Sequence, residues 1–283
     1  MDNVNNIIYQ AKFALKNNWL MAINILDNAL KTFPDSEEIY MELAEIYHSK
    51  NAHKKTMDCY TKVLKINPQN DLARFKLGNL YLEMNEPKLA IVSYNKIKED
   101  YPEALYNKAI AYRTMQKHDE AIKTLKELVT HSVQMINAYK YLVEILIMFG
   151  KTKEASKYVE LAKNSFGNTC MVHYLRGLVF AREKNLIGAY HEYMIASRED
   201  AEYPHIHGLL GKLAEAIGQS HLVLKHLKNA VRSSHDNTNS INELVIHVVN
   251  NRLANNVDDF IALLDGFDES IVIKAVEKFK LQM

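Results

Sequence analysis

The sequence has only two cysteines, Cys59 and Cys170, which stand far apart in a chain of 283 residues. This usage favours small buried or half-buried thiols in a reducing compartment over a disulfide or a metal-binding pair. The chain also lacks an excess of either charge, since 35 Lys and Arg residues balance 34 Asp and Glu residues. A net charge of +1 produces no long-range field that would gather phosphates, so nucleic acid is not expected as the main partner.

Long apolar runs are missing as well. No stretch approaches the roughly 18 consecutive apolar residues that a membrane-spanning helix needs. The N-terminus has no basic start followed by an apolar run, so a signal peptide is not indicated. A hydrophobic fraction of 48% excludes a disordered chain. We therefore expect a folded protein of the cytoplasm that does not insert into membranes.

Motifs that carry chemistry are absent too. The chain has no Gly-x-Ser-x-Gly, no dinucleotide fingerprint and no His-Glu-x-x-His. The run from Gly208 to Lys212 is too short for a phosphate loop. The last third is rich in histidine, but His205 and His207, the closest pair, are alternate residues and point apart on a helix. We interpret these histidines as surface or packing residues, and expect no catalytic residues, no metal site and no cofactor.

A repeat of 34 residues dominates what is present. One ladder of large residues contains a single 31-residue step and consists of Phe13, Tyr47, Tyr81, Tyr112, Leu146, Phe180 and Ala214. A ladder of small residues with the same single short step consists of Ala22, Thr56, Ala90, Ala121, Ala155, Ala189 and Val223. Prolines follow the same period at Pro34, Pro68 and Pro102. Independent ladders with one period indicate a repeat architecture.

The spacing inside each repeat is helical. Tyr40, Leu43, Ala44 and Tyr47 stand at i, i+3, i+4 and i+7. Polar breakers such as Asn51 and the Asn17–Asn18 pair separate two helices in each repeat. The pattern predicts a helical hairpin, repeated seven times.

These hairpins resemble the tetratricopeptide repeat, most clearly at Arg74, Leu77, Gly78 and Tyr81, which Ala90, Tyr94 and Pro102 follow. The resemblance implies an all-α, right-handed solenoid of about seven hairpins. We expect the array to cover residues 1–235, followed by a degenerate eighth hairpin and a capping helix in residues 236–283. The expected units are about 3–36, 37–70, 71–101, 102–135, 136–169, 170–203 and 204–237.

Two details of the packing follow from the ladders. The small ladder positions should mark close contact between the two helices of a hairpin, and the aromatic positions should fill the wedge between successive hairpins. The 31-residue step predicts a shortened junction around Tyr101, Pro102 and Glu103 that alters the superhelix locally.

Members of this family line a concave groove with the first helix of each hairpin. Carried over to this chain, the resemblance predicts a partner-binding surface. Its expected residues are Met41, Phe75, Asn79, Tyr106, Asn107, Arg113, Lys140, Tyr141 and Tyr174. The aromatic members have no ladder role and would serve as anchors, while the asparagines could bond the backbone of an extended peptide. Chaperone adaptors of the family clamp a terminal carboxylate with lysine and arginine, and the required cations are missing here, which disfavours such a clamp.

We expect a protein-interaction scaffold or adaptor rather than an enzyme, with a peptide segment or helix of another protein as partner. One alternative is a structural assembly subunit or homo-oligomer that uses its convex face or its terminal helices. A second is the regulatory arm of an enzyme complex. RNA binding of the pentatricopeptide type fits poorly, because the period is 34 residues and the charge is balanced.

Overall fold

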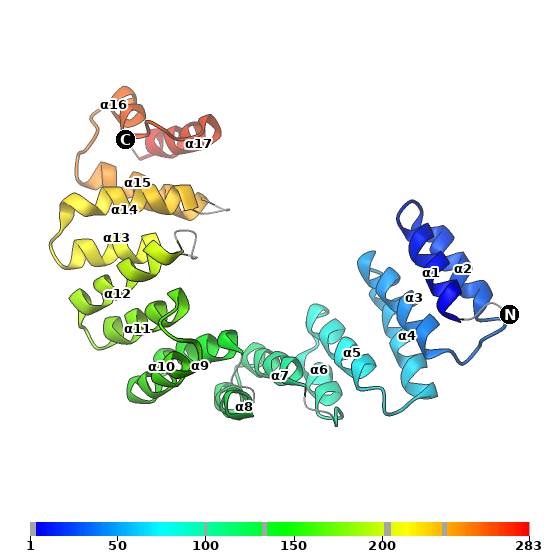
Figure 1. The fold of residues 1–283 in the computed structure, drawn as a ribbon. Coiled ribbons are helices and arrows are strands. Elements are labelled where there is room, and N and C mark those ends of the chain that lie inside the picture. Colours follow the sequence, from blue (N-terminus) through cyan, green and yellow to red (C-terminus); the bar gives the residue numbers. More distant parts are fainter. Residues whose placement is uncertain (1–3, 99–100, 132–134, 201–204, 234–236, 283) are drawn as a thin grey trace. The chain divides into compact units, whose positions relative to one another are not determined.

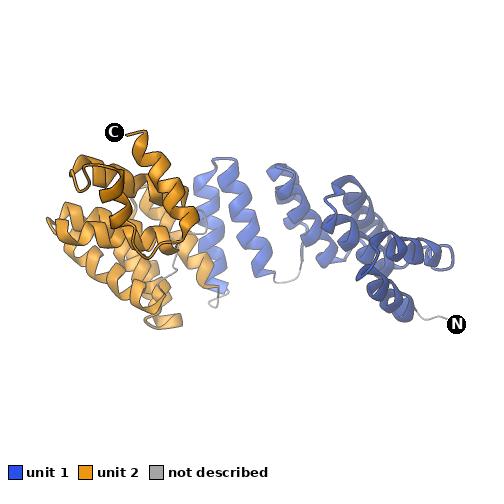
Figure 2. Ribbon diagram, turned by 90° about the horizontal axis from the view of Figure 1, so that it is seen from above, with its two compact units in different colours: residues 1–132 blue, residues 133–283 orange. Residues whose placement is uncertain are grey.

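The computed structural model describes residues 4–98, 101–131, 135–200, 205–233 and 237–282. Within these ranges all regular secondary structure is helical and forms 17 helices. The chain divides into two compact units, residues 1–132 and 133–283 (Figures 1 and 2). The all-α prediction is therefore confirmed. No helix in the described ranges is both long and apolar enough to cross a membrane.

The first unit contains four pairs of neighbouring helices (Figure 1). The helices α1 to α8 span Val4–Leu15, Trp19–Ala29, Glu37–Ser49, His53–Ile66, Asp71–Glu83, Pro87–Tyr94, Pro102–Thr114 and His118–His131. Each odd-numbered helix packs on the even-numbered helix that follows it. We call them the first and second helix of a hairpin.

The second unit continues the same alternation. The helices α9 to α17 span Ile136–Met148, Thr152–Phe166, Cys170–Arg182, Leu186–Glu199, Ile206–Ala216, Ser220–Ser233, Thr238–Asn250, Val257–Leu263 and Glu269–Lys280. The two units together provide seven hairpins, α1–α2 to α13–α14, and a C-terminal region of three helices. This is the architecture that the ladders predict, whereas the domain boundary at residue 235 stays a prediction.

One turn geometry ends the first helix in six of these seven hairpins and recurs after α15. In each turn a single residue takes a left-handed conformation, with φ between 51° and 76°. The N–H of the next residue donates back to a carbonyl five residues earlier, as in Ala52 to Tyr47 at 2.9 Å. The left-handed residues are Asn51, Asn85, Gln116, Gly150, Lys184, Gly218 and Arg252. Arg252 lies 34 residues after Gly218, so the turn after α15 continues the period, although α15 packs on α14 and α17; the predicted eighth hairpin stays a prediction.

The small ladder residues mark close helix contacts, as expected. Ala22, Ala90 and Ala121 are fully buried. A Cβ atom on Gly78 would stand 2.9 Å from Cζ of Tyr94, and one on Gly177 would stand 2.9 Å from Cζ of Tyr193. Because real Cβ contacts are not that short, these two glycines let a tyrosine of the second helix lie against the backbone of the first.

The first hairpin departs from the predicted frame. Its turn has no left-handed residue, and the N–H of Asn18 donates to Ala14 only four residues earlier, at 2.8 Å. The shorter turn shifts α1 by one position, so that Ala11 and Ala14 are buried while Phe13 is 62% exposed. The expectation that each ladder aromatic fills a wedge between hairpins is therefore wrong for Phe13.

The 31-residue step corresponds mainly to a short second helix. Helix α6 has 8 residues where α4 has 14, and α7 starts at Pro102 directly after its N-cap Tyr101. The sequence predicted the shortening around Tyr101 to Glu103, but much of it falls at the end of α6. An effect on the superhelix stays a prediction.

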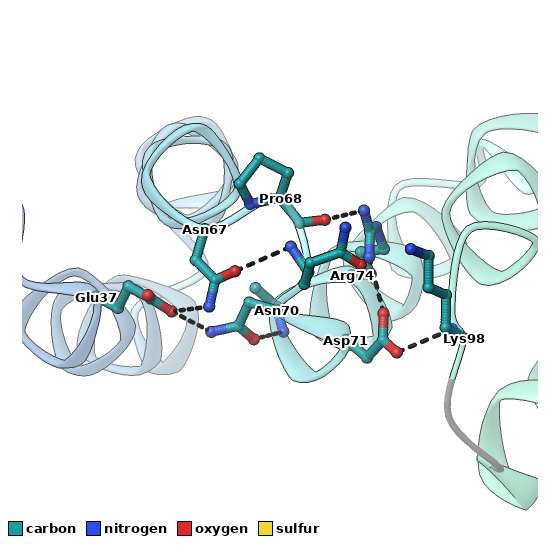
Figure 3. A network of polar contacts seen from close by, with 9 residues as sticks. Glu37, Asn67, Pro68, Asn70, Asp71, Arg74 and Lys98 are labelled. Atoms are coloured by element: carbon teal, nitrogen blue, oxygen red, sulfur yellow. Dashed lines mark hydrogen bonds and ion pairs between the residues drawn. The ribbon is translucent and has the colours of Figure 1, made fainter.

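A polar network fixes the chain around this step (Figure 3). The carboxylate of Glu37 accepts from the side chains of Asn67, at 3.1 Å, and Asn70, at 2.7 Å. Asp71 is buried and forms an ion pair of 2.8 Å with Arg74. The guanidinium of Arg74 also donates to the carbonyl of Pro68. The other carboxylate oxygen of Asp71 accepts from the backbone N–H of Lys98 at 2.8 Å. Asp71 thereby holds the segment after α6 against the start of α5.

The C-terminal region has its own core. Phe279 of α17 stacks on Phe260 of α16 with ring centroids 4.3 Å apart, and Ala275 is fully buried with them. These contacts cover the apolar face that α14 and α15 present at this end of the second unit. Capping helices in this region were predicted, because a solenoid must cover its last apolar face.

Candidate partner-binding site

Two asparagines of neighbouring first helices lie side by side in the first unit. Asn107 of α7 donates from Nδ2 to Oδ1 of Asn79 on α5, at 2.8 Å. The same oxygen accepts from the hydroxyl of Tyr94 at 2.7 Å. The two bonds orient both amide groups. They use one amide oxygen of Asn79 and one N–H of Asn107, which leaves the Nδ2 donors of Asn79 and the Oδ1 acceptor of Asn107 for other partners.

Phe75 stands one turn before Asn79 on α5. Its ring centroid lies 5.4 Å from that of Tyr101 and 6.4 Å from that of Tyr94. The side chain is half-buried in a small cluster with Ala90 and Ala104. Neighbouring rings thus cover part of Phe75, and the rest of its surface is accessible beside Asn79.

The other predicted residues of the first unit differ in exposure. Tyr106 on α7 is half-buried, and Arg113 near the end of α7 is exposed. Met41 on α3 lines a hollow of about 600 Å³ between α1, α3 and α5. An ion pair of 2.6 Å between Lys12 and Glu42 borders that hollow. The structure places Phe75, Asn79 and Asn107 together, and Met41 in a separate part of the first unit's surface.

The second unit brings two predicted residues together. The ammonium of Lys140 lies 5.7 Å from the ring centroid of Tyr174, within cation–π range. Tyr174 in turn packs on Tyr193 at 5.8 Å. Burial, with the Glu144 carboxylate nearby, raises the pKa of Tyr174 to about 12, so the phenol stays protonated at neutral pH. Tyr141 has only 6% of its surface exposed and offers little to a partner.

Histidines of the second unit are held by packing and hydrogen bonds. His173 lies 2.7 Å from a carboxylate oxygen of Glu192. His226 shares a hydrogen bond of 2.9 Å with the hydroxyl of Tyr190, and its ring stacks on His207 at 6.2 Å. In the part of the chain that the structure describes, no group of three or more His, Cys, Asp or Glu side chains could hold a metal ion. The described contacts of His173, His207 and His226 are thus contacts with neighbouring side chains.

Sequence reasoning missed Tyr94, which bonds Asn79, Tyr101, which packs on Phe75, and Lys108 on α7. Tyr94 belongs to a second helix and Tyr101 to a junction, while the prediction searched first helices only. Lys108 could have been found from the repeat, because it interrupts a row of leucines.

Comparison with known proteins agrees with this architecture. Models of the tetratricopeptide repeat match residues 37–70, 59–92 and 103–131. The chain is a tetratricopeptide repeat protein. All the matched residues lie in the first unit.

Two curated relatives match part of the chain. A stretch of 133 residues is 26% identical to the peroxisomal targeting signal receptor of Kluyveromyces lactis, and covers 46% of this chain and 22% of that protein. A stretch of 144 residues is 28% identical to the receptor of the same name from Saccharomyces cerevisiae, and covers 49% and 23%. The chain thus matches less than a quarter of the length of these relatives.

Solved structures show the same fold at low identity. PilF of Pseudomonas aeruginosa has a TM-score of 0.56 at 18% identity, over 69% of this chain and 90% of that chain. YrrB, described as a repeat protein with an unusual peptide-binding site, has a TM-score of 0.52 at 16% identity, over 69% and 97%. These likenesses concern the fold alone.

Proposed function

We propose that this protein is a non-enzymatic adaptor that binds an extended peptide segment of another protein along first helices of its hairpins. In the first unit the proposed contact residues are Phe75, Asn79, Tyr106 and Asn107. Lys140 and Tyr174 would form a contact region of their own in the second unit. Met41 and Arg113 would make peripheral contacts.

The main support for this proposal is the hydrogen-bonded pair of Asn79 and Asn107. A peptide backbone presents alternating N–H and C=O groups, and each needs a partner when it leaves water. Asn79 and Asn107 hold one another at 2.8 Å, so the donors of one amide and the acceptor of the other have fixed directions. Such a pair can bind both groups of a single peptide unit, whatever the side chains of that peptide are.

The aromatic residues would supply affinity. Phe75 is held by Tyr94 and Tyr101, so little side-chain entropy is lost when a partner covers its accessible surface. Relatives named as targeting signal receptors support a peptide as the ligand class. The cytoplasmic location expected from the sequence stays a prediction.

The test begins with selection of ligands from a random peptide library on the whole chain. The best peptide is then measured against Asn107→Ala and Tyr106→Ser, with Asn24→Ala, an exposed asparagine of α2, as the matched control. We expect losses on the order of tenfold for each groove variant and none for the control. Equal affinity of all variants, with helical content unchanged, would contradict the proposal.

One observation favours assembly as a second function. The first hairpin exposes several large apolar side chains, including Tyr9 at 71% and Phe13 at 62%. Leu20 and Met21 at the start of α2 are exposed as well. Sedimentation of the wild type and of a Tyr9→Lys, Phe13→Lys variant tests this alternative. Self-association that the variant abolishes supports it, and a monomer at all concentrations contradicts it.

A further inference from the structure

Lys108 stands in a row of the repeat that otherwise holds mostly buried leucines. Steps of 34 residues, with the single step of 31, connect Leu43, Leu77, Lys108, Leu142, Arg176, Leu210 and Leu244. All five leucines are buried in the core. Lys108 is half-buried on α7, at a repeat position that buried leucines occupy in five other repeats.

The other cation of this row has an anionic partner. Arg176 on α11 pairs with Glu160 of the preceding hairpin at 3.0 Å. The residue at the same repeat position as Glu160 in the hairpin before Lys108 is Asn95, which carries no charge. Among the residues that the structure describes, no hydrogen bond or ion pair holds the Lys108 ammonium. An anion bound beside this ammonium would give it a charge-assisted partner.

Space for such an anion lies beside Lys108. A cavity of about 340 Å³ opens between α6, α7 and α8. Helix α6 ends early at Tyr94, so Ile97 lies outside it, and Asp71 anchors the next residue, Lys98, through its backbone N–H at 2.8 Å. Tyr101 is the N-cap of α7. The cavity therefore lies where the repeat has lost part of a helix.

The wall of the cavity has an apolar part and a polar part. Tyr94, Ile97, Tyr101 and Leu105 line one part with rings and aliphatic groups. Lys108, Glu127 and His131 provide the polar part. Glu127 and His131 are exposed on α8, where water screens their charges, while Lys108 is half-buried.

We propose that this cavity is a binding site for a carboxylate carried on an apolar body, with Lys108 as the residue that binds the anion. The apolar body packs against Tyr101, Leu105 and Ile97, and the carboxylate meets the ammonium. A free organic acid and an acidic side chain flanked by apolar residues share this chemistry. The site shares no lining residue with the proposed peptide contacts Phe75, Asn79, Tyr106 and Asn107, so it goes beyond the proposed function.

The experiment titrates the whole chain with 3-phenylpropionate, using ligand-observed NMR and the ε-carbon signal of ¹³C-labelled lysine. The uncharged 3-phenylpropionamide and the cationic 3-phenylpropylamine are matched probes of the same shape. We expect saturable binding of the acid that shifts the Lys108 signal, and affinity on the order of tenfold weaker for the amide. Stronger binding of the amine, with loss of that binding in Glu127→Gln, would overturn the proposal.

Two variants test whether binding of the acid depends on the positive charge of Lys108 or only on the shape of the cavity. Lys108→Leu restores the residue that five repeats carry in this row, so the fold should be retained, and thermal melting checks this. We expect it to lose binding of the acid by about tenfold or more, and Lys108→Arg to keep it. Unchanged binding in Lys108→Leu, or no binding of the acid to the wild type, would overturn the proposal.

A peptide competition distinguishes a free organic acid from an acidic side chain of a polypeptide as the ligand. The capped peptide acetyl-Leu-Glu-Leu-amide is compared with its glutamine counterpart as a competitor of 3-phenylpropionate. Competition by the glutamate peptide alone supports a polypeptide ligand, and failure of both peptides supports a free organic acid. Equal competition by both peptides would overturn the role of the carboxylate.

Discussion

Tyr94 lies flat against the backbone of Gly78, and its hydroxyl donates to Asn79, the next residue of α5, at 2.7 Å. One side chain of α6 therefore fixes both the contact between two helices and the orientation of an amide in the proposed site. The same arrangement of a tyrosine over a glycine recurs at Tyr193 and Gly177 in the second unit. Helix packing and the geometry of the proposed site are thus coupled in the third hairpin, α5–α6.

The close contact between Tyr94 and Gly78 predicts the effect of adding a methyl group at this glycine. Gly78→Ala should lower the free energy of unfolding by about 1–3 kcal/mol, because Tyr94 must move away from the new methyl group. Gly208→Ala is the matched control, since its methyl group would meet nothing closer than 3.7 Å. The control should stabilise by about 0.5–1 kcal/mol, because alanine favours the helix. Chemical denaturation measures both, and equal effects of the two would contradict the contact.

The left-handed turns predict a stabilising change. Lys184 adopts φ of 62°, as Gly150 does with φ of 71° one repeat earlier. A side chain in this region costs about 1–2 kcal/mol, which glycine avoids. Lys184→Gly should therefore raise the free energy of unfolding by up to about 1 kcal/mol, and Gly150→Ala should lower it by a similar amount. Thermal melting of both variants checks the turn, and a destabilised Lys184→Gly would count against it.

Buried histidine predicts loss of stability in acid. Burial, with His207 and Lys225 nearby, lowers the pKa of His226 from 6.5 to about 4. The unfolded chain therefore takes up a proton more readily than the folded one. The stabilisation from the neutral ring is complete above pH 6.5 and is lost as the pH falls toward about 4, by an amount on the order of 3 kcal/mol.

The measurement is denaturation between pH 7.5 and pH 4.5 for the wild type and for His226→Gln, which removes the titration and can still bond Tyr190. We expect the variant to lose less stability over this interval than the wild type. His191→Gln, at an exposed position of α12, is the control and should follow the wild type. The account of His226 fails if all three chains show the same pH dependence.

Much of the fold could be predicted because the repeat leaves a strong pattern. Small residues such as Ala90 and Gly78 recur where helices touch, and polar breakers such as Asn51 recur at the turns. The exceptions arise from local geometry. The shift of α1 that exposes Phe13 depends on a turn one residue shorter, which residue spacing in the sequence does not reveal.

The candidate site could be predicted in part. Position in the repeat placed Asn79 and Asn107 on adjacent first helices, and the structure joins them by a hydrogen bond. The part played by Tyr94 could not be derived, because it needs the exact depth at which α6 packs on α5. The burial of Tyr141 likewise depends on how neighbouring helices cover α9. The cavity beside Lys108 results from the early end of α6, which the sequence indicates only as a short step.

The most direct test of the central claim observes the side-chain amides of Asn79 and Asn107 by NMR while a library-selected peptide is added to the whole chain. Signals are assigned with Asn79→Ala and Asn107→Ala. If the pair binds a peptide backbone, both amide signals shift with the same dissociation constant, and methylation of one backbone nitrogen of the peptide weakens binding by about tenfold. Unshifted amides, with shifts confined to the first hairpin around Tyr9 and Phe13, would contradict a peptide-binding groove and point to assembly through α1 and α2.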